Sequence, residues 1–442
     1  MLVAGSAEGA FSLSCESTAV TGAFAWLGNE MTFTPSADLT ENGFCEITVD
    51  VAAMDVGGTA MATAFQTDFT VVDLWTIVYN ISADEQITGL DVDADGNVYA
   101  VGWNTSATGQ DIWMAKYDKH GSLTWSDSVT SDGVHNDNGH DVAVDSTGSV
   151  YFVGSINSTA TGDDVWIRKY TPALGIDWTT TYNSSGAQTD RAYGVAVDSG
   201  DNLIVTGYIT VAGQSANIWV RKYSATSVVQ WTQTYNGADN GDDVGLDVAV
   251  DGSDSVYVIG NYDAGPANAL DVWVRKYTSG GVESWTDTFN GTLNDNDAGN
   301  GIAATATGEV YATGYTHMTG EDANIWARRY DSAGASTYTD DFTSTGADAD
   351  IGYDIAVDGE GNYVVAGLTT ETTGQDVWIR ELNGDDAEIG TWTVNGTGDS
   401  NDLATAAAFD PLGNFYIGGA VTQSAGYDFW IRKFDPAGNF VE

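Results

Sequence analysis

A motif that occurs seven times constrains the fold of this chain more than any other feature. The sequence Asp/Asn-x-Trp recurs at spacings of 52 to 54 residues, with its tryptophan at positions 113, 166, 219, 273, 326, 378 and 430. A second aromatic position recurs with nearly the same period, at residues 75, 125, 178, 231, 285, 338 and 392. Repeats of this length that cannot bury their apolar faces alone must stack against one another, as the units of solenoids and propellers do.

Each copy reads as four short strands, which we call A, B, C and D in chain order. An alternating A segment such as Gly194-Val-Ala-Val-Asp198 leads through a short turn into a B segment such as Leu203-Ile-Val-Thr-Gly207. The distance from the Asp of that turn to the Gly is nine residues in all seven copies, with Thr305 in place of Asp once. An invariant length predicts a tight hairpin without room for insertions.

Four-stranded units of this period are typical of the blades of a β-propeller. The chain enters the array on a D segment at Trp75 and leaves it on a C segment at Trp430, so the last blade lacks a D strand of its own. We expect the segment from Trp75 to Asn80 to complete that blade and close the ring, which removes the sheet edges. The sequence therefore predicts an all-β protein: a seven-bladed propeller over residues 73–442, preceded by a partial Ig-like β-sandwich over residues 1–72.

Copies such as Asp164-Val-Trp-Ile-Arg-Lys-Tyr170 and Ala192-Tyr-Gly-Val-Ala-Val-Asp198 resemble the SBBP-type β-propeller repeat of secreted and surface-exposed bacterial and archaeal proteins. The resemblance covers roughly residues 73 to 442. It implies export and a role at the surface or in the matrix, and it brings no catalytic residues with it.

The N-terminal segment carries a second resemblance. Met31-Thr-Phe-Thr-Pro-Ser-Ala-Asp-Leu39 and Cys45-Glu-Ile-Thr-Val49 resemble the S-layer-type bacterial Ig-like domain over about 60 residues, whereas a complete domain of this type has about 100. The first residues lack the pattern of a signal peptide. We expect a truncated part of a longer exported chain; a cytosolic protein is the alternative. Cys15 and Cys45 either form a disulfide or are two unpaired core residues.

The charge excludes several classes of function. With 63 acidic and 14 basic residues the formal net charge is -49, which argues against binding to nucleic acid or to anionic membranes. No apolar run is long enough to insert into a membrane. Twelve of the 14 basic residues follow the C-strand tryptophan by two or three positions, as in Arg221-Lys222. Alternation places the arginine on the tryptophan side of the strand, and we expect each arginine to pair with a repeated aspartate such as Asp145 or Asp198.

Acidic loops are candidates for calcium. The D-A and B-C connections vary in length, are predicted to share one rim of the ring, and are rich in carboxylates and amides, which are hard ligands suited to Ca²⁺. Asp91-Val-Asp-Ala-Asp-Gly96 also resembles the calcium loops of integrin-like propellers, although it falls on an A-B turn. Polar turns use the same residue types, so ordinary turns are the alternative. The candidate ligands are Asp239, Asp242, Asp243, Asp295, Asp297, Asp91, Asp93 and Asp95.

A few residues depart from the repeat and are candidates for a ligand-binding face: Trp103, His135, His140, His317 and Arg191. The sequence contains no nucleophile elbow, phosphate loop or zinc spacing, and no cofactor other than Ca²⁺ is expected. The sequence favours a non-catalytic extracellular or cell-surface module that binds a glycan, the matrix or a surface protein. The alternative is a secreted polysaccharide lyase or glycoside hydrolase that acts on the propeller face.

Overall fold

The computed structural model describes the strands of the N-terminal segment and most of the repeat region. The described residues are 11–15, 18–19, 21–27, 30–35, 44–49, 65–70 and 74–440, the last range without residues 81–83, 108, 132–134, 159, 185–187, 238–239, 266–268, 294, 319–321, 343–348, 372–373, 397–400 and 424–425. The chain divides into two compact units, residues 1–74 and residues 75–442.

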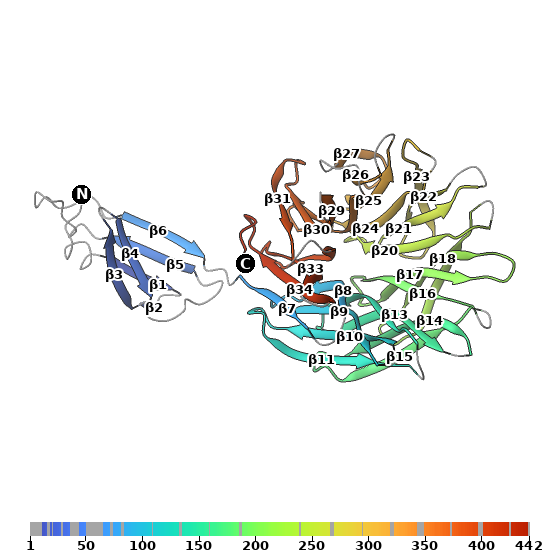
Figure 1. Cartoon of the computed structure of the whole chain (residues 1–442), viewed down its shortest axis with the longest axis horizontal. Coiled ribbons are helices and arrows are strands. Elements are labelled where there is room, and N and C mark those ends of the chain that lie inside the picture. The colour runs from blue at the N-terminus through green and yellow to red at the C-terminus, as the bar shows by residue number, and fades with distance from the viewer. Residues whose placement is uncertain are drawn as a thin grey trace, which may run out of the picture. The chain divides into compact units, whose positions relative to one another are not determined.

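The second unit is a seven-bladed β-propeller in which every blade is a four-stranded antiparallel sheet. Figure 1 shows the blades arranged around a ring, with consecutive blades side by side. The A strands line the centre: β8 (Glu85–Val92), β12 (Asn138–Val144), β16 (Arg191–Val197), β20 (Val244–Val250), β24 (Ala298–Ala304), β28 (Ile351–Val357) and β32 (Leu403–Phe409). The B strands follow: β9 (Val98–Ser106), β13 (Val150–Ser158), β17 (Leu203–Thr210), β21 (Val256–Asp263), β25 (Val310–His317), β29 (Tyr363–Glu371) and β33 (Phe415–Gln423).

The C and D strands complete each blade toward the outside. The C strands are β10 (Gly109–Tyr117), β14 (Gly162–Tyr170), β18 (Ala216–Tyr223), β22 (Leu270–Tyr277), β26 (Ala323–Tyr330), β30 (Gly374–Leu382) and β34 (Gly426–Phe434). The D strands are β11 (Leu123–Val129), β15 (Ile176–Tyr182), β19 (Val229–Tyr235), β23 (Glu283–Phe289), β27 (Ser336–Phe342), β31 (Glu388–Val394) and, for the last blade, β7 (Thr76–Tyr79). We number the blades 1 to 7 in the order of their A strands.

The predicted closure of the ring is confirmed. Strand β7 pairs antiparallel with β34, with Thr76 opposite Arg432 and Tyr79 opposite Phe429. In Figure 1 the blue β7 lies beside the red β34, so the two ends of the repeat array meet within one sheet. Blade 7 thereby gains the fourth strand that its own sequence lacks.

The constant distance between the turn aspartate and the glycine has a steric cause. Every A strand carries a bulge at the same place, for example between Gly139 and Asp141. The bulge brings the A-strand backbone against the B-strand glycine, so a Cβ on Gly154 would lie 2.1 Å from the carbonyl oxygen of Asn138. Only glycine fits where two backbones approach this closely.

The tryptophans of the repeat fall into two structural groups. Those of the C strands are buried between blades, and Trp219 in blade 3 is fully buried, stacked 5.6 Å from Tyr182 of blade 2. Most D-strand tryptophans are half-buried at the outer rim, where an indole such as that of Trp231 donates a hydrogen bond to the carbonyl of Ser279 in the next blade. Both groups therefore join neighbouring blades.

The expected pairing of the basic residues is wrong in one respect. The lysine, not the arginine, pairs with the aspartate that ends strand A: Lys169 Nζ lies 3.5 Å from Asp145, and Lys222 Nζ lies 2.5 Å from Asp198. The arginine one position earlier lies on the tryptophan side, as alternation predicts, and in blades 2 to 5 and 7 it stacks on rings. In blades 4, 5 and 6 it also pairs with other acidic groups: Arg275 with Glu283, Arg328 with Asp287, and Arg380 with Asp340. Arg221 lies 3.9 Å from the centre of Tyr182 and 4.9 Å from that of Trp219, and its Nε donates to Thr232 at 2.8 Å.

We expect Arg221→Ala to lower the free energy of unfolding by about 1–2 kcal/mol, because two hydrogen bonds, one of them long, and three ring contacts are lost. Thermal melting monitored by circular dichroism measures the change. Arg221→Lys serves as the comparison: it keeps the charge but not the planar group, and we expect most of the loss to remain. An unchanged melting temperature in both variants would show that the stacked arginines add nothing to stability.

In blade 6 the sequence indicates an insertion in the hairpin between strands C and D, but the cause is a tryptophan that has changed its position on strand D. The distance between the two tryptophans Trp378 and Trp392 exceeds that of the other blades, which suggests a longer C-D hairpin. The hairpin has its usual length, but Gly390 stands where the other blades have an aromatic residue, and Trp392 lies two positions further along the strand. From there its indole still covers Gly438 of the next blade, as Trp231 covers Gly281.

The N-terminal unit is also built from strands. One sheet has the order β2-β1-β5-β6, formed by β1 (Phe11–Cys15), β2 (Thr18–Ala19), β5 (Phe44–Val49) and β6 (Phe65–Thr70), and β3 (Gly22–Leu27) pairs with β4 (Glu30–Pro35). The register of β1 and β5 sets the backbone of Cys15 opposite that of Cys45. Among the described residues of the whole chain, no helix is long and apolar enough to cross a membrane.

Candidate functional site at the mouth of the central channel

The variable loops share one face of the propeller, and a repeated aspartate organises them. In blade 2 the amide of Asp137 donates to the carbonyl of Gln110, which lies in the preceding blade. The Asp137 carboxylate accepts from the amides of Ser131 in the D-A loop and Asn157 at the end of strand B. This buried residue thus holds the D-A loop and the end of strand B through its side chain, and a strand of the preceding blade through its backbone amide.

Two of the calcium candidates, Asp243 and Asp297, belong to this repeated class. Each is fully buried, and in each both carboxylate oxygens accept backbone amides: Gly237 and Asp263 donate to Asp243, and Gly291 and His317 donate to Asp297. In this structure these carboxylates organise the loops through hydrogen bonds. Asp242 and Asp295 are exposed nearby, and Asp239 lies outside the described residues.

The calcium candidates Asp91, Asp93 and Asp95 each have a different environment, and the first two are engaged by different backbone amides. Asp91 accepts from the amides of Val92 and, in blade 2, Val144. Asp93 caps its own turn by accepting from the amides of Asp95 and Asn97, as the equivalent aspartates do in other blades. Asp95 is exposed. Among the described residues no group of three His, Cys, Asp or Glu side chains is placed to hold a metal ion, and calcium binding stays a prediction.

A ring of seven side chains surrounds the mouth of the central channel on the loop face. Each comes from the bulge of one A strand, and the register shift at each bulge leaves that residue without a partner on strand B. All seven border a hollow of about 360 Å³. In blade order they are Thr88, His140, Tyr193, Leu246, Asn300, Tyr353 and Thr405. The positions are equivalent, yet five different residue types occupy them.

Three members of this ring join blades. The side chains of Thr88, Asn300 and Thr405 donate to the carbonyls of Gly139, Gly352 and Ile87 respectively, each in the next blade. His140 differs from them, because its Nε2 is buried and has no hydrogen-bond partner among the described residues. A buried polar atom without a partner costs free energy, so this nitrogen is a candidate contact for a ligand.

His140 is part of a cluster that spans blades 2 and 3. Its ring lies 4.7 Å from that of Tyr193, which lies 6.0 Å from the ring of Tyr208. Arg191 stands opposite Tyr208 in the ladder of β16 and β17. Arg191 forms an ion pair with Asp163, and its Nε and Nη2 both bond to Oδ2 of that carboxylate.

Burial and the positive charge of Arg191 lower the pKa of His140 to about 3. The imidazole is therefore neutral at physiological pH and offers one donor and one acceptor. Burial alone would lower the pKa of Arg191, but the neighbouring phenols and the Asp163 carboxylate outweigh it and raise the pKa, so the guanidinium stays charged. The cluster combines a neutral ring, two phenols and one cation.

A second hollow, of about 610 Å³, adjoins this cluster. Gln110, His135, Asn136, Asn138, Asn157, Asp163, Thr189 and Arg191 line it. Most of these groups are neutral amides and hydroxyls, which can both donate and accept hydrogen bonds. Residues of β12 and β16 line both hollows, so these two strands carry aromatic rings on one hollow and polar groups on the other.

Deeper in the channel, carboxylates alternate with glycines around the ring. Asp141, Asp247 and Asp354 stand in blades 2, 4 and 6 directly after the bulge, and Gly89, Gly194 and Gly301 occupy the same position in blades 1, 3 and 5. A Cβ on Gly194 would lie 2.8 Å from the Cα of Asp247. Each aspartate therefore requires a glycine in the preceding blade.

Each channel aspartate also joins its blade to the next. Asp247 accepts from its neighbour Val248 at 2.6 Å and from Ile302 of blade 5 at 2.7 Å. Burial and then the negative charge of Asp354 raise the pKa of Asp247 to about 8, and burial raises the pKa of Asp354 to about 6. Burial and the charge of Asp247 also hold the pKa of Asp141 well above its usual range.

Of the five departures from the repeat, the structure brings three together. His140, Arg191 and His135 lie around the mouth in blades 2 and 3. Trp103 lies in blade 1, opposite Gln86 of β8, and His317 lies in blade 5, where its ring contacts Tyr315. Sequence reasoning missed Tyr193 and Tyr353. The signal was present, because the residue just before the Gly/Asp position differs in almost every copy.

Comparisons with known proteins support the architecture. No model of a protein family matches the chain. Over 145 residues it is 30% identical to an uncharacterized WD repeat-containing protein, L264, of Acanthamoeba polyphaga mimivirus, a match that spans 29% of this chain and 10% of that protein. The chain therefore spans only a small part of this relative, and the match supports a repeat-built propeller.

Solved structures of similar shape include two enzymes. A polysaccharide lyase described as a PL25 ulvan lyase has 12% identity and a TM-score of 0.50, over 81% of this chain and 95% of that one. The polysaccharide lyase Uly1 has 9% identity and a TM-score of 0.50, over 79% and 90%. The β-propeller domain of the Trilobed protease from Pyrococcus furiosus has 6% identity and a TM-score of 0.47, over 81% and 97%. At such identities the likeness shows the fold alone.

Proposed function

We propose that this protein is a non-catalytic binding module that holds a glycan at the mouth of its channel. The carrying observation is the ring of bulge residues, because equivalent positions hold different side chains in a chain whose other positions repeat. Packing between blades explains uniform positions. A ring whose side chains differ from one blade to the next is suited instead to contact an asymmetric ligand.

The chemistry of the mouth fits a sugar. The faces of Tyr193 and Tyr208 can carry the apolar face of a pyranose, while the amides of Asn136 and Asn138 can bond its hydroxyls. With a net charge of -49, the long-range field repels polyanions. A neutral glycan is therefore favoured over a strongly anionic one.

The place of action is proposed from the family resemblance. We propose that the module works outside the cell or at its surface, as the resemblance to SBBP-type repeats and to Ig-like domains implies. There the partner would be a glycan, a matrix polymer or a glycosylated surface protein. Calcium in the acidic loops would add to loop order in such a medium, and chelation followed by calorimetric titration tests this.

The binding test compares variants at the mouth with one at the opposite face. A glycan array followed by isothermal titration calorimetry identifies and measures the ligand. We expect Tyr193→Ala and His140→Ala each to weaken binding at least about tenfold, which corresponds to about 1.4 kcal/mol. Leu412→Ser, in an exposed A-B turn, is the control and leaves affinity unchanged. Equal affinity in all variants, with melting temperatures preserved, would exclude the mouth as the binding site.

The second candidate is a polysaccharide lyase, which the arrangement of His140, Tyr193 and Arg191 favours. In such an elimination a base removes the proton next to a uronate carboxylate, the glycosidic bond breaks, and an acid protonates the leaving oxygen. The low pKa of His140 argues against this role, because a general base works best with a pKa near the working pH. Formation of an unsaturated, ultraviolet-absorbing product from uronate polymers would establish the lyase, and its loss in His140→Ala would assign the base.

A further inference from the structure

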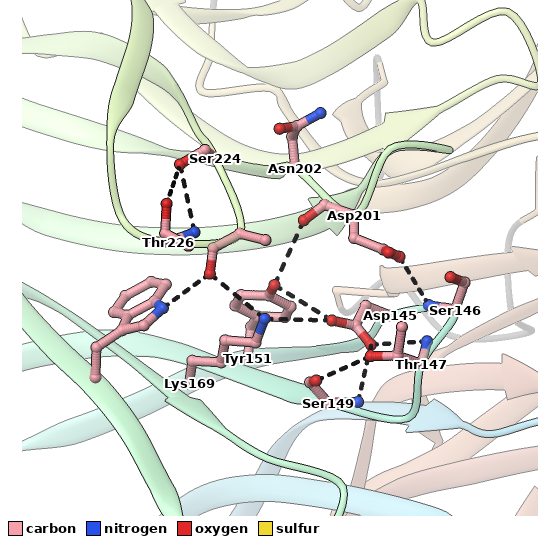
Figure 2. Close-up of polar contacts among 12 residues, drawn as sticks. Asp145, Ser146, Thr147, Ser149, Tyr151, Lys169, Asp201, Asn202, Ser224 and Thr226 are labelled. Carbon is pink, nitrogen blue, oxygen red and sulfur yellow. Dashed lines mark hydrogen bonds and ion pairs between the residues drawn. The ribbon is translucent and has the colours of Figure 1, made fainter.

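A lysine at one position of strand C joins the blades at the outer part of the propeller. In blade 2, Lys169 Nζ lies 3.5 Å from the Asp145 carboxylate and 3.4 Å from the carbonyl of Ala225 in blade 3. Figure 2 shows this ammonium between Asp145 and the turn that contains Ser224 and Thr226. We call this arrangement the lysine node.

The lysine node recurs in the following blades. Lys222 lies between Asp198 and the carbonyl of Ser279, and Lys276 lies between Asp251 and the carbonyl of Ser332. In blade 5 an arginine takes the position, and Arg329 bonds to the carbonyl of Gly384 and to Asp386. In each case a cation joins an acidic group to the carbonyl of the next blade's C-D turn.

Blade 6 carries the opposite charge at this position. Glu381 replaces the lysine and is 2% exposed, and its Oε2 is buried with no hydrogen-bond partner among the described residues. Burial, followed by the negative charges of Asp435 and Asp358, raises the pKa of Glu381 to about 7. Asp358 is the blade 6 counterpart of Asp145, so the acidic half of the node is kept and its cation is absent from the sequence.

The rest of the node is formed by blade 7. The turn that follows its strand C closes through the hydrogen bonds of Asp435 with Asn439 and Gly438, as the C-D turns of the other blades do. The turn residue that corresponds to Ala225 is Pro436. The Asp435 carboxylate is engaged by the amides of Ala437 and Asn439. By equivalence with the lysine nodes, Glu381, Asp358 and the Pro436 carbonyl are the groups that we place around the position of the missing ammonium. The Asp358 carboxylate also accepts from the amides of its own turn, as Asp198 does in a lysine node.

We propose that blade 6 binds a hard divalent cation, such as Ca²⁺, at the position that an ammonium group occupies in the lysine nodes. Two carboxylates and one backbone carbonyl are oxygen ligands of the kind that Ca²⁺ prefers, and water completes the six to eight contacts. Since the third acidic side chain nearby, Asp435, is engaged by the amides of its own turn, two carboxylates remain, and we expect an affinity in the range of extracellular calcium modules, about 10⁻⁴–10⁻³ M. The cation would neutralise the buried Glu381 and join blade 6 to blade 7.

The test uses the internal repeat as its control. Melting temperatures of the whole chain are measured in chelator and in millimolar CaCl₂, with NaCl of equal ionic strength to account for screening. We expect Ca²⁺ at about ten times its Kd to raise the melting temperature of the natural chain by about 2 °C. Glu381→Lys rebuilds a lysine node, so in chelator it should melt at the temperature that the natural chain reaches with Ca²⁺ bound in blade 6, and it should lose this part of the Ca²⁺ response.

Two results would overturn the proposal. If Glu381→Lys keeps the full response to Ca²⁺, the cation binds elsewhere, for example in the D-A loops. If Ca²⁺ has no effect while Glu381→Gln is as stable as the natural chain, Glu381 is a neutral acid that needs no cation. Asp358→Asn provides an independent check. It should lower the affinity for Ca²⁺, measured by calorimetric titration, about tenfold or more.

Discussion

Trp219→Ala is expected to lower the free energy of unfolding by about 3–5 kcal/mol, the cost of a large cavity in a packed core. The indole is fully buried in blade 3, stacks on Tyr182 of blade 2 and lies under Arg221. Its removal therefore weakens one blade and the junction with the preceding one. Chemical denaturation followed by fluorescence and circular dichroism measures the loss.

The matched control is a tryptophan of the same blade. Trp231 lies on the outer strand, where it is half-buried and covers Gly281 of blade 4. Because less of its surface leaves water on folding, Trp231→Ala should cost clearly less than Trp219→Ala. Equal losses at the two positions would show that the inner and outer tryptophans contribute alike, contrary to the burial pattern.

The second large effect concerns pH. Burial raises the pKa of Asp247 to about 8 and that of Asp354 to about 6 in the folded chain, above the ordinary values near 4 that apply after unfolding. The folded state therefore binds more protons than the unfolded state between about pH 4 and pH 8. The stabilisation from these protons is complete below pH 4 and is lost as the pH rises through 6 and 8. The melting temperature should accordingly fall from pH 5 to pH 8.

Asp247→Asn separates this effect from the general charge of the chain. The variant cannot titrate at this position, so the slope of melting temperature against pH should become shallower. Its absolute stability should also drop by about 1–3 kcal/mol, because an amide cannot accept from both Val248 and Ile302. Asp331→Asn, in an exposed C-D turn, should keep the slope of the natural chain. An unchanged slope in Asp247→Asn would place the pH dependence outside the channel.

The propeller could be predicted from the sequence because its signals repeat. One tryptophan or one glycine is ambiguous, but seven copies at fixed distance exclude most alternatives, and the position of Trp75 before the first complete repeat specified the closing strand. The interpretation of Arg221 and Lys222 was less successful. Alternation placed the two side chains on opposite faces, yet only the folded blade shows on which face the carboxylate of Asp198 lies.

The candidate site was harder to predict for a physical reason. A bulge shifts the strand register by one residue, so Tyr193 and Tyr353 turn toward the channel at positions where simple alternation gives no warning. His140 and Arg191 were found as departures from the repeat, but their contact depends on two blades whose A strands lie next to each other in space. Mean composition gave no information on this. The pattern of variation at one repeat position would have revealed the ring.

The alternation of Asp and Gly in the channel sets a rule for rebuilding this protein. Gly89 precedes Asp141, Gly194 precedes Asp247 and Gly301 precedes Asp354, so the pattern repeats every two blades, and a seventh blade with Ala406 fills the remaining place. Blades are therefore interchangeable only with blades of the same kind, Asp for Asp or Gly for Gly, or as Asp–Gly pairs. A chimera that exchanges blades 2 and 3 for blades 4 and 5 keeps each aspartate opposite a glycine, whereas moving a single blade sets Asp against Asp at one junction and leaves a gap at another. An even-numbered ring made of such pairs would need no odd blade at all.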